Sequence, residues 1–257
     1  MLAWILRGLR KGVVTSRYPH RPDPELEGFR ARIEVANRES AGAELEAICP
    51  TGAIRVEAGR VSLDRGACIL CGACVEVAPE RFRFSSAYET ADRRRAGLVV
   101  GEAVERTLEE VRVPLAAQAR PLRRSVHIRH VDAGSDGSEE WEIAALTNPY
   151  YDMQRLGLYF TLSPRHADVL LVTGGVTTAM RAPLERAYEV MPEPKAVIAA
   201  GTDACSGGLA ATCGEIASGV DRVLPVDVYV PGSPPSPLAL LHGLLLAAGI
   251  VVEEAAA

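Results

Sequence analysis

The sequence predicts two domains: a small α+β domain built around cysteines, followed by a larger α/β domain with a parallel β-sheet. Two observations carry this prediction. Cys68, Cys71 and Cys74 lie close together in the N-terminal half of the chain. From Ser125 onward, short apolar runs alternate with helical patterns, and this strand–helix–strand order predicts a parallel sheet with right-handed crossovers. A chain of 257 residues is long enough for one large domain or two modest ones.

Composition and charge exclude several classes of protein. Hydrophobic residues make up 48% of the chain, which is ample for a core and excludes a disordered or collagen-like protein. The net charge of -5 argues against general nucleic-acid binding, which needs a basic surface. The 6 cysteines are too sparse for a disulfide scaffold in a chain of this length. Their spacing is therefore more informative than their number.

The first residues, MLAWILRGLRKGVV, have the pattern of an amphipathic helix. Apolar side chains recur at helical spacing, whereas Arg7, Arg10 and Lys11 share another face. Trp4 suits a membrane interface, so the pattern predicts a helix that lies on a membrane surface or docks on a partner. The alternative is a helix packed on its own domain. We assign residues 1–29 to this helix and an extended arm, and no stretch of the chain is long enough to span a membrane.

The cysteines of residues 30–92 have the spacing of an iron–sulfur site. The run from Cys68 through Cys71 to Cys74 is C-x2-C-x2-C, and Cys49 is followed by a proline, as in bacterial ferredoxins. Three thiolates from a tight loop and one remote thiolate can surround a cubane. We therefore predict one [4Fe–4S] cluster on these four cysteines. A structural zinc site is the alternative, because four thiolates also suit Zn²⁺.

The ligands of a second cluster are absent from this domain. At the ferredoxin spacing, Glu39, Gly42 and Leu45 occupy the three thiolate positions before Cys49. Ala78 occupies the fourth position, directly before a proline. We therefore expect no second cluster and no two-cluster relay.

Alternating strands and helices follow a linker. Residues 93–121 are predicted to be a linker that contains a helix, and residues 122–257 form the larger domain. In a parallel sheet, functional loops lie beyond the carboxyl ends of the strands, which here places GGVTTAM, GTDACSGG and PGSPPSP at one edge. The expected strands are 168–173, 195–200 and 226–230, and the expected helices are 177–191 and the segment that begins at Pro237.

Two long stretches resemble subunits of one enzyme superfamily. Residues 1–92, with WILRGLRKGVVTSRYP near the front, resemble the ferredoxin-like iron–sulfur subunit of membrane-bound hydrogenase, formate hydrogenlyase and respiratory complex I assemblies. Two segments of the larger domain resemble the small subunit of the same assemblies, the 20 kDa subunit of complex I. They are SPRHADVLLVTGGVTTAMRAPLERAYEVMPEPKAVIAAGTDACSGG and VDRVLPVDVYVPGSPPSPLALLHGLL. The resemblance implies two subunits fused in one chain. The implied fold is an α+β ferredoxin-like domain followed by an α/β flavodoxin-like parallel-sheet domain, with an N-terminal amphipathic helix.

The small subunit of that superfamily normally holds a [4Fe–4S] cluster next to the large subunit, and the resemblance implies where its ligands would lie. In this sequence Asp136 and Glu139 stand in the first ligand motif, Asp203 in the second loop and Ser233 in PGSPP. Carboxylates and a hydroxyl are poor iron–sulfur ligands, so we expect no cluster in this domain. The acidic side chains could bind a hard cation, serve a proton path, or fill the vacated space as a hydrogen-bonded remnant. Cys205, two residues beyond Asp203, is expected to be a buried bystander.

The resemblance implies two functions. The first is an iron–sulfur electron-transfer subunit of a membrane-associated oxidoreductase, of the NADH-quinone oxidoreductase or group 4 NiFe-hydrogenase type. The second is a non-redox structural coupling subunit of a complex I-related ion-translocating complex that has lost the hydrogenase-type electron path. A third reading, a metal-dependent catalytic site in the acidic pocket, lacks a histidine or nucleophile beside the carboxylates. No complete active site is expected in this chain.

The partners implied are other subunits and the membrane. We expect a large hydrogenase or 49 kDa-like subunit, the membrane subunits of a complex I-like assembly, and a membrane surface reached through the N-terminal helix. Nucleic acid is not expected. The implied location is the cytoplasmic face of the cell membrane, with peripheral attachment.

Overall fold

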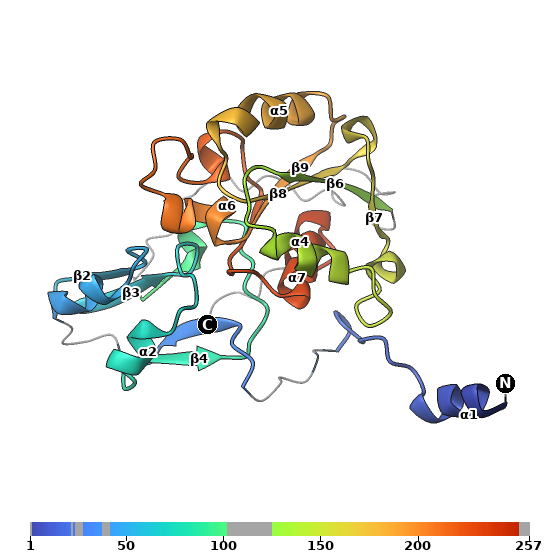
Figure 1. The fold of residues 1–257 in the computed structure, drawn as a ribbon, viewed down its shortest axis with the longest axis horizontal. Coiled ribbons are helices and arrows are strands. Elements are labelled where there is room, and N and C mark those ends of the chain that lie inside the picture. Colours follow the sequence, from blue (N-terminus) through green and yellow to red (C-terminus); the bar gives the residue numbers. More distant parts are fainter. Residues whose placement is uncertain (1, 22, 24–27, 38–41, 102–124, 252–257) are drawn as a thin grey trace.

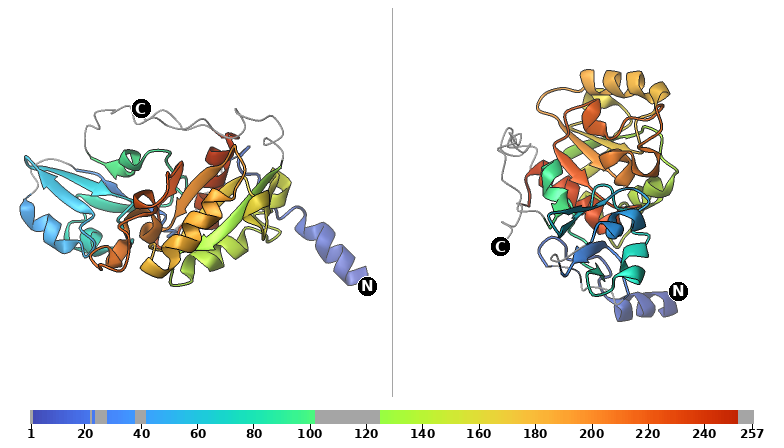
Figure 2. Two further views of the ribbon diagram at one scale, coloured as in Figure 1. Left: turned by 90° about the horizontal axis from the view of Figure 1, so that it is seen from above. Right: turned by 90° about the vertical axis from the view of Figure 1, so that its left-hand side faces the viewer.

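The structure, a computed structural model, describes residues 2–21, 23, 28–37, 42–101 and 125–251. A small cysteine-bearing domain packs beside a larger domain with a central sheet (Figure 1). Helix α1 (Leu2–Lys11) projects away from both of them in every view (Figure 2). The helix expected in the linker lies outside the described residues.

The small domain consists of two antiparallel sheets joined by loops and short helices. One sheet pairs β1 with β4, and the other has the order β2-β3-β5. Strand β5 belongs to the segment expected to be a linker, so this sheet extends beyond residue 92. The elements in chain order are β1 (Arg32–Val35), η1 (Ala43–Ile48), β2 (Ile54–Glu57), β3 (Arg60–Asp64), α2 (Ala73–Val77), β4 (Phe82–Ser85), η2 (Arg95–Leu98) and β5 (Val99–Val100).

The hairpin between β2 and β3 is closed by a two-residue turn. Glu57 pairs with Arg60, which leaves Ala58 and Gly59 as the two turn residues. Both have positive φ, at 50° and 75°. This is the backbone that favours a tight hairpin, because its twist matches that of the two strands.

Apolar side chains fill the positions where a second cluster would have needed thiolates. Leu45 and Ala78 are both buried, at 6% and 4% exposure. They belong to the same core as Ile33, Leu63 and Phe82. Two of the four positions without a thiolate therefore contribute to the hydrophobic core of the small domain.

The larger domain is built on a five-stranded parallel sheet with the order β10-β9-β8-β6-β7, which confirms the predicted parallel sheet. Strands β8 and β9 are buried along their whole length, because helices cover both faces of the sheet. Helices α4 and α7 pack on one face, and α5 and α6 on the other (Figure 1). The bounds are β6 (Val126–Asp132), α4 (Ser138–Ala145), η4 (Met153–Leu156), β7 (Leu158–Phe160), η5 (Pro164–His166), β8 (Val169–Thr173), α5 (Thr178–Glu189), β9 (Ala196–Ala200), α6 (Thr202–Ser206), η6 (Gly208–Ala210), η7 (Val220–Arg222), β10 (Val228–Val230) and α7 (Pro237–Ala248).

Helix α7 begins with a proline and a capping serine. The Ser236 hydroxyl accepts a hydrogen bond from the backbone N–H of Ala239 at 3.3 Å, and Pro237 occupies the first turn. Leu240, Leu241 and most of the residues that follow are buried against the sheet. No helix among the described residues is both long and apolar enough to cross a membrane.

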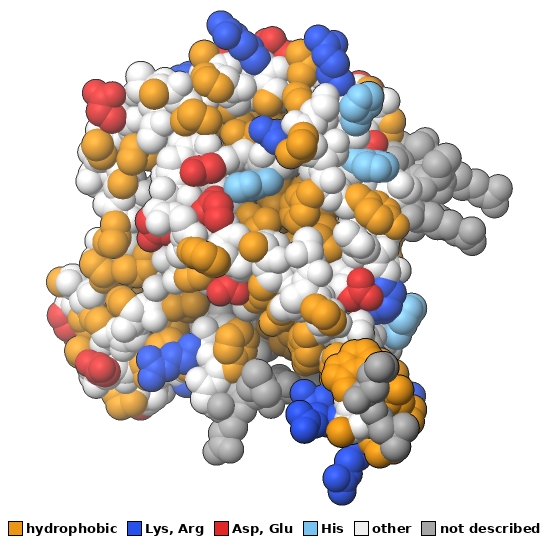
Figure 3. Space-filling model, turned by 45° about the vertical axis from the view of Figure 1, so that its right-hand side comes forward, with side chains coloured by type: hydrophobic (Ala, Val, Ile, Leu, Met, Phe, Trp, Pro, Cys, Tyr) orange, Lys and Arg blue, Asp and Glu red, His pale blue; other side chains and the backbone are white. Residues whose placement is uncertain are grey.

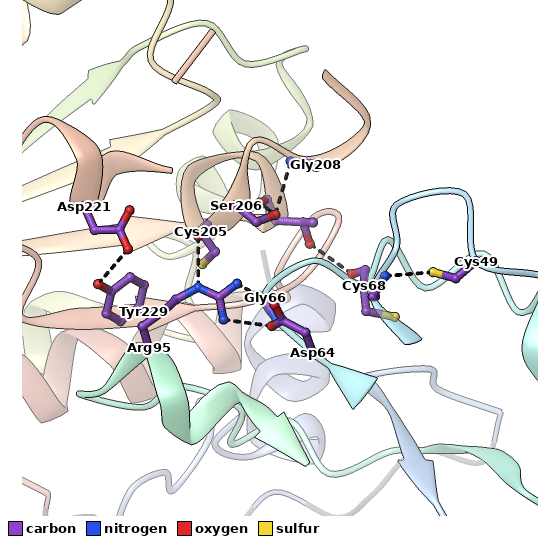
Figure 4. Close-up of polar contacts among 12 residues, drawn as sticks. Cys49, Asp64, Gly66, Cys68, Arg95, Cys205, Ser206, Gly208, Asp221 and Tyr229 are labelled. Carbon is purple, nitrogen blue, oxygen red and sulfur yellow. Dashed lines mark hydrogen bonds and ion pairs between the residues drawn. The ribbon is translucent and has the colours of Figure 1, made fainter. Parts of the chain in front are cut away.

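Arg95 is one of the residues that link the two domains. The Arg95 guanidinium makes two hydrogen bonds to the Asp64 carboxylate, at 2.8 and 2.6 Å, at the end of β3 (Figure 4). Its Nε also donates to the backbone carbonyl of Cys205 in α6, at 3.2 Å. Nearby, the backbones of Asp92 and Tyr229 exchange two hydrogen bonds, at 3.0 and 2.8 Å. This antiparallel bridge also links strand β10 to the segment that follows β4.

Replacing Arg95 with methionine tests this junction. The Arg95→Met variant leaves the half-buried Asp64 carboxylate without its cation, so we expect the free energy of unfolding in urea to fall by about 2 kcal/mol. Arg83→Met is the control, because the Arg83 side chain is 67% exposed and its ion pair with Glu34 lies at the surface. We expect the control to cost less than about 1 kcal/mol. Equal losses in the two variants would contradict this role of Arg95.

Candidate functional site

The four cysteines of the small domain lie on two segments that approach each other. Cys49 follows η1, Cys68 and Cys71 lie in the loop that leads into α2, and Cys74 lies in the first turn of α2. Cys68 and Cys74 are buried, Cys49 is half-buried and Cys71 is exposed. Burial raises the pKa of the Cys68 thiol to about 12, and the other three thiols act on it electrostatically. All four sulfur-bearing side chains therefore lie in one neighbourhood.

The loop folds this way because two of its residues adopt the left-handed backbone. Leu70 has a φ of 56°, and Gly72 has a φ of 84° directly before α2. A Cβ atom on Gly72 would also come within 3.1 Å of the Phe84 ring. Glycine is therefore the residue that this position accepts most easily, for both backbone and packing reasons.

Backbone N–H groups point toward the sulfur atoms. The N–H of Ala53 donates to the Cys49 sulfur at 3.2 Å. Burial raises the pKa of Cys74 to about 11, and a backbone hydrogen bond at Val75 acts in the opposite direction. A backbone hydrogen bond at Leu70 likewise lowers the pKa of Cys68 against the effect of burial. Such hydrogen bonds stabilise negative charge on sulfur.

These residues fit an iron–sulfur cluster. Buried thiols are neutral unless a cation compensates the charge of the thiolate, and iron supplies that charge. In the part of the chain that the structure describes, no three Cys, His, Asp or Glu side chains are arranged around a single metal ion. The thiolates of a cubane bind four different irons and stand farther apart than the ligands of one ion.

The larger domain brings three of its four replaced ligand positions together. Asp136 is exposed just before α4, Glu139 is buried in the first turn of α4, and Asp203 is half-buried in α6. Ser233 is exposed on the loop after β10. Among the described residues, no hydrogen bond links Ser233 to these carboxylates. The acidic group therefore has three members, not the four expected from the sequence.

The pKa values of the three carboxyls are shifted in different directions. The pKa of Glu139 is raised to about 7, mainly by burial and also by the nearby negative charges of Asp203 and Asp136. Burial and Asp136 also raise the pKa of Asp203. Hydrogen bonds from the Ser138 hydroxyl and backbone, at 2.6 and 2.9 Å, lower the pKa of Asp136. At neutral pH, Glu139 is therefore partly protonated beside a charged Asp136.

Glu139 is packed tightly against the backbone of the neighbouring loop. Gly201 has a φ of 96°, and a Cβ atom there would approach the Glu139 carboxylate oxygen to 2.5 Å. Glycine at this position lets the buried carboxyl approach the chain after β9. The side chain of Glu139 therefore occupies the space at the carboxyl ends of the strands.

Sequence reasoning assigned no role to His130, which forms a polar network at the same edge of the sheet. Its Nε2 lies 2.9 Å from the Thr173 hydroxyl and 3.3 Å from a Glu140 carboxylate oxygen. The Thr173 hydroxyl donates to Glu140 at 2.6 Å. Burial lowers the pKa of His130, so the ring is neutral at neutral pH. Thr173 is the last residue of β8, and a polar residue at the carboxyl end of a parallel strand is the one feature of the sequence that points to this network.

The remaining cysteines lie apart from this neighbourhood or within the core. Cys205 is 1% exposed, and its sulfur lies 3.6 Å from the Ala199 carbonyl in the core of the larger domain. Cys213 is exposed. Cys205 is buried as expected from the sequence.

The cysteine loop and the acidic group are close neighbours in space. Thr202, which directly precedes Asp203, donates a hydrogen bond from its hydroxyl to the backbone carbonyl of Cys68, at 3.0 Å. Figure 4 shows Cys68 between Ser206 of α6 on one side and Cys49 on the other. The loop that carries one acidic position therefore contacts the segment that carries three cysteines.

Both halves of the chain match known families. The family described as "NADH ubiquinone oxidoreductase, 20 Kd subunit" matches residues 137–247. The "4Fe-4S single cluster domain" family matches residues 61–120. The second range contains three of the four clustered cysteines but not Cys49.

Individual relatives are hydrogenase subunits. Formate hydrogenlyase subunit 7 of Escherichia coli is 38% identical over 158 residues, which are 62% of this chain and 61% of that protein. The probable membrane-bound hydrogenase subunit mbhJ of Pyrococcus furiosus is 42% identical over 133 residues, 52% of this chain and 80% of that protein. The chain thus spans 61% of the length of the first relative and 80% of the second.

A solved structure is also similar. It is that of the membrane-bound sulfane sulfur reductase, an archaeal respiratory membrane complex. The identity is 30% and the TM-score is 0.46, over 51% of this chain and 72% of that chain.

Glu139→Gln tests the buried carboxyl. A carboxyl whose pKa is raised by folding keeps its proton in the folded state while the unfolded chain loses it. Stability therefore falls as the pH rises from about 4.5 toward about 7, and the loss is complete above that range. We expect Glu139→Gln to be more stable than the wild type by roughly 2 kcal/mol near pH 8.

The same measurement near pH 5 is expected to show little difference, because the folded wild type then carries a protonated Glu139 that is as uncharged as the glutamine of the variant. Thermal unfolding at the two pH values provides the readout. Glu185→Gln is the control, because the Glu185 side chain is 41% exposed and its ion pair with Arg181 lies at the surface; we expect it to change stability by less than about 0.5 kcal/mol at either pH. A stabilisation by Glu139→Gln that is equal at both pH values would contradict the raised pKa.

Proposed function

The chain belongs to the family of the 20 kDa subunit of NADH ubiquinone oxidoreductase, here joined to a 4Fe-4S domain, and from that premise we propose an electron-transfer function. The protein acts as an iron–sulfur subunit of a membrane-associated oxidoreductase of the complex I-like or hydrogenase-like kind. It carries one [4Fe–4S] cluster, held by Cys49, Cys68, Cys71 and Cys74. The observation that carries this proposal is the common neighbourhood of these four thiols, with backbone N–H groups directed at their sulfurs.

The protein residues around the thiols fit this task. When bound, a [4Fe–4S] cluster supplies one-electron redox chemistry. The buried Cys68 and Cys74 pack within the core of the small domain, which excludes water from two sides of the site. Cys71 is exposed and offers the shortest approach for a redox partner. The N–H groups near sulfur stabilise the reduced state, which carries one more negative charge.

The larger domain supports a docking role. Its former ligand positions now carry Asp136, Glu139, Asp203 and Ser233, which do not suit a second cluster. Large apolar side chains are exposed nearby, with Trp141 on α4 at 80% exposure. Exposed aromatic side chains of this kind are suited to burial by a partner subunit. The partner we propose is a large hydrogenase or 49 kDa-like subunit.

A second candidate function follows from the same acidic residues. Carboxylates in place of thiolates interrupt the electron route between the small domain and such a large subunit. The alternative is therefore a non-redox structural coupling subunit of a complex I-related ion-translocating complex. The observation in its favour is the buried Glu139, whose pKa of about 7 suits a group that exchanges protons near neutrality.

Helix α1 provides the proposed contact with the membrane. Trp4 and Leu9 are 81% and 76% exposed, and Arg7 and Arg10 lie on the same short helix. Figure 3 shows hydrophobic and basic side chains together on this projecting helix, at the lower right. Apolar side chains beside basic ones suit the surface of an anionic bilayer. We place the protein at the cytoplasmic face of the cell membrane, where it also meets the membrane subunits of the assembly.

The iron content of the chain tests the proposed cluster. Protein purified without oxygen is expected to contain about four irons and four labile sulfides per chain. Cys71→Ser is expected to abolish both, whereas Cys213→Ser, which alters another exposed cysteine, keeps them. About eight irons would contradict the single cluster, and zinc without sulfide would favour a structural metal site.

The same variants separate the two candidate functions in the assembled complex. Electron transfer requires reduction of the cluster by the physiological donor during turnover, and Cys71→Ser then stops turnover. Ion transport that continues unchanged in Cys71→Ser, with the complex still assembled, would instead support the structural coupling function.

Vesicle flotation tests helix α1. The full chain is expected to float with vesicles that contain anionic lipid, and Trp4→Ser combined with Leu9→Ser is expected to weaken binding by at least about tenfold, because two large apolar side chains leave the bilayer surface. Leu209→Ser is the control, since Leu209 is 64% exposed on the larger domain. Undiminished binding of the double variant would contradict the membrane contact.

A further inference from the structure

The cysteine loop packs directly on loops of the larger domain that bear the replaced ligand positions. Cys68 and Leu70 line a narrow space together with Pro231 and Gly232, which belong to the loop after β10. The volume of this space is about 10 Å³, about enough for one water molecule. The two loops are therefore in close contact, and solvent hardly separates them.

Thr202 makes the hydrogen bond across this contact. Its hydroxyl donates to the Cys68 carbonyl at 3.0 Å, and the residue is 1% exposed. Its backbone N–H donates to the Gly232 carbonyl at 2.7 Å, which fixes the threonine within its own domain. A buried hydroxyl needs a partner, and here the partner is the peptide of a cysteine in the other domain.

Helix α6 is attached to the small domain at both ends. Thr202 at its start contacts Cys68, and the Cys205 carbonyl near its end accepts a hydrogen bond from Arg95. Arg95 in turn holds Asp64, four residues before Cys68. The Ser206 hydroxyl donates to the Thr202 carbonyl at 3.0 Å and closes the turn. Hydrogen bonds from both ends of α6 therefore hold the segment from β3 to the cysteine loop in place.

The hydrogen bond to the Cys68 carbonyl affects the position of a cluster ligand. It fixes the peptide that follows Cys68, and with it the orientation of the loop whose backbone N–H groups face sulfur. The potential of an iron–sulfur cluster depends on the hydrogen bonds around its sulfurs and on solvent exposure. Both depend on how firmly this loop is held against the larger domain.

We propose that Thr202 is a positioning residue for the cluster on Cys49, Cys68, Cys71 and Cys74. Its hydroxyl holds the Cys68 peptide in place, and so sets the redox potential and the retention of the cluster. A segment of the larger domain, adjoining the acidic position Asp203, thereby supports the cluster of the small domain. This inference rests on the proposed function, since it requires that cluster.

The test compares four variants of the full chain, purified without oxygen with the cluster in place. Thr202→Val removes the hydroxyl at nearly constant volume, Thr202→Ala removes it with a smaller side chain, and Thr202→Ser keeps it. Thr178→Val is the control, because the Thr178 hydroxyl, at the exposed start of α5, also donates to a backbone carbonyl, that of Glu215 at 3.1 Å, and to the Glu215 carboxylate at 3.0 Å.

The midpoint potential, followed by electron paramagnetic resonance, and the rate of iron loss to a chelator are the two readouts. We expect Thr202→Val and Thr202→Ala to shift the potential in the same direction and to lose iron about fivefold faster, as the loss of one buried hydrogen bond implies. Thr202→Ser and Thr178→Val are expected to match the wild type. If Thr202→Val fails to fold, Thr202→Ala provides the same comparison.

Three outcomes would overturn the inference, and they are distinguishable. A wild-type chain with a normal cluster, whose potential and iron loss are unchanged in both Thr202→Val and Thr202→Ala, refutes the role of Thr202 alone. A Thr202→Ser variant that behaves like Thr202→Val does the same, because the hydroxyl is then not the active feature. A wild-type chain that binds no iron refutes the proposed function and this inference with it.

Discussion

The arrangement of the two domains depends on Arg95, whose side chain is held within the small domain by a bidentate ion pair with Asp64. This ion pair joins the end of β3 to η2, and the remaining N–H of the same guanidinium reaches the Cys205 carbonyl in α6. Because arginine presents its donors in a rigid fork, one side chain fixes both a distance and an orientation. The cysteine loop begins only four residues after Asp64, so its position relative to the larger domain follows from this contact.

The two domains show different physical outcomes where cluster thiolates are absent. In the small domain, Leu45 and Ala78 fill the space with hydrocarbon and add to the core. In the larger domain, Asp136, Glu139 and Asp203 place carboxyl groups close together in a partly buried region. Apolar side chains stabilise the fold by leaving water. Buried carboxyls cost stability unless one keeps a proton, which the raised pKa of Glu139 reflects.

Local pattern was enough to predict the main elements, but not the contacts between them. The spacing of the four cysteines and the apolar runs of β8 and β9 are properties of short segments, and they predicted a cysteine site and a parallel sheet. Strand β5 was missed, because two residues carry no periodic signal. Arg95, Thr202 and His130 act through partners far away in the sequence, so no local pattern could identify them. Ser233 stands in a motif of its own, PGSPP, and its exposure and, among the described residues, its lack of a hydrogen bond to the carboxylates of the acidic group are properties of the folded loop that the motif alone does not predict.

The junction between the domains combines hydrogen bonds with apolar packing, since Leu98 and Tyr88 belong to hydrophobic clusters of the larger domain, and both halves lie in one chain. Separate subunits need a large apolar interface to overcome the entropy of association. Two modules in one chain meet at a high effective concentration, so association requires no such area. The contacts of Arg95 and Thr202 then mainly fix the relative orientation of the two domains, because the shared peptide chain already keeps the domains together. Either half therefore tolerates mutations that would dissociate a two-chain complex, provided that these hydrogen bonds and the apolar packing beside them remain.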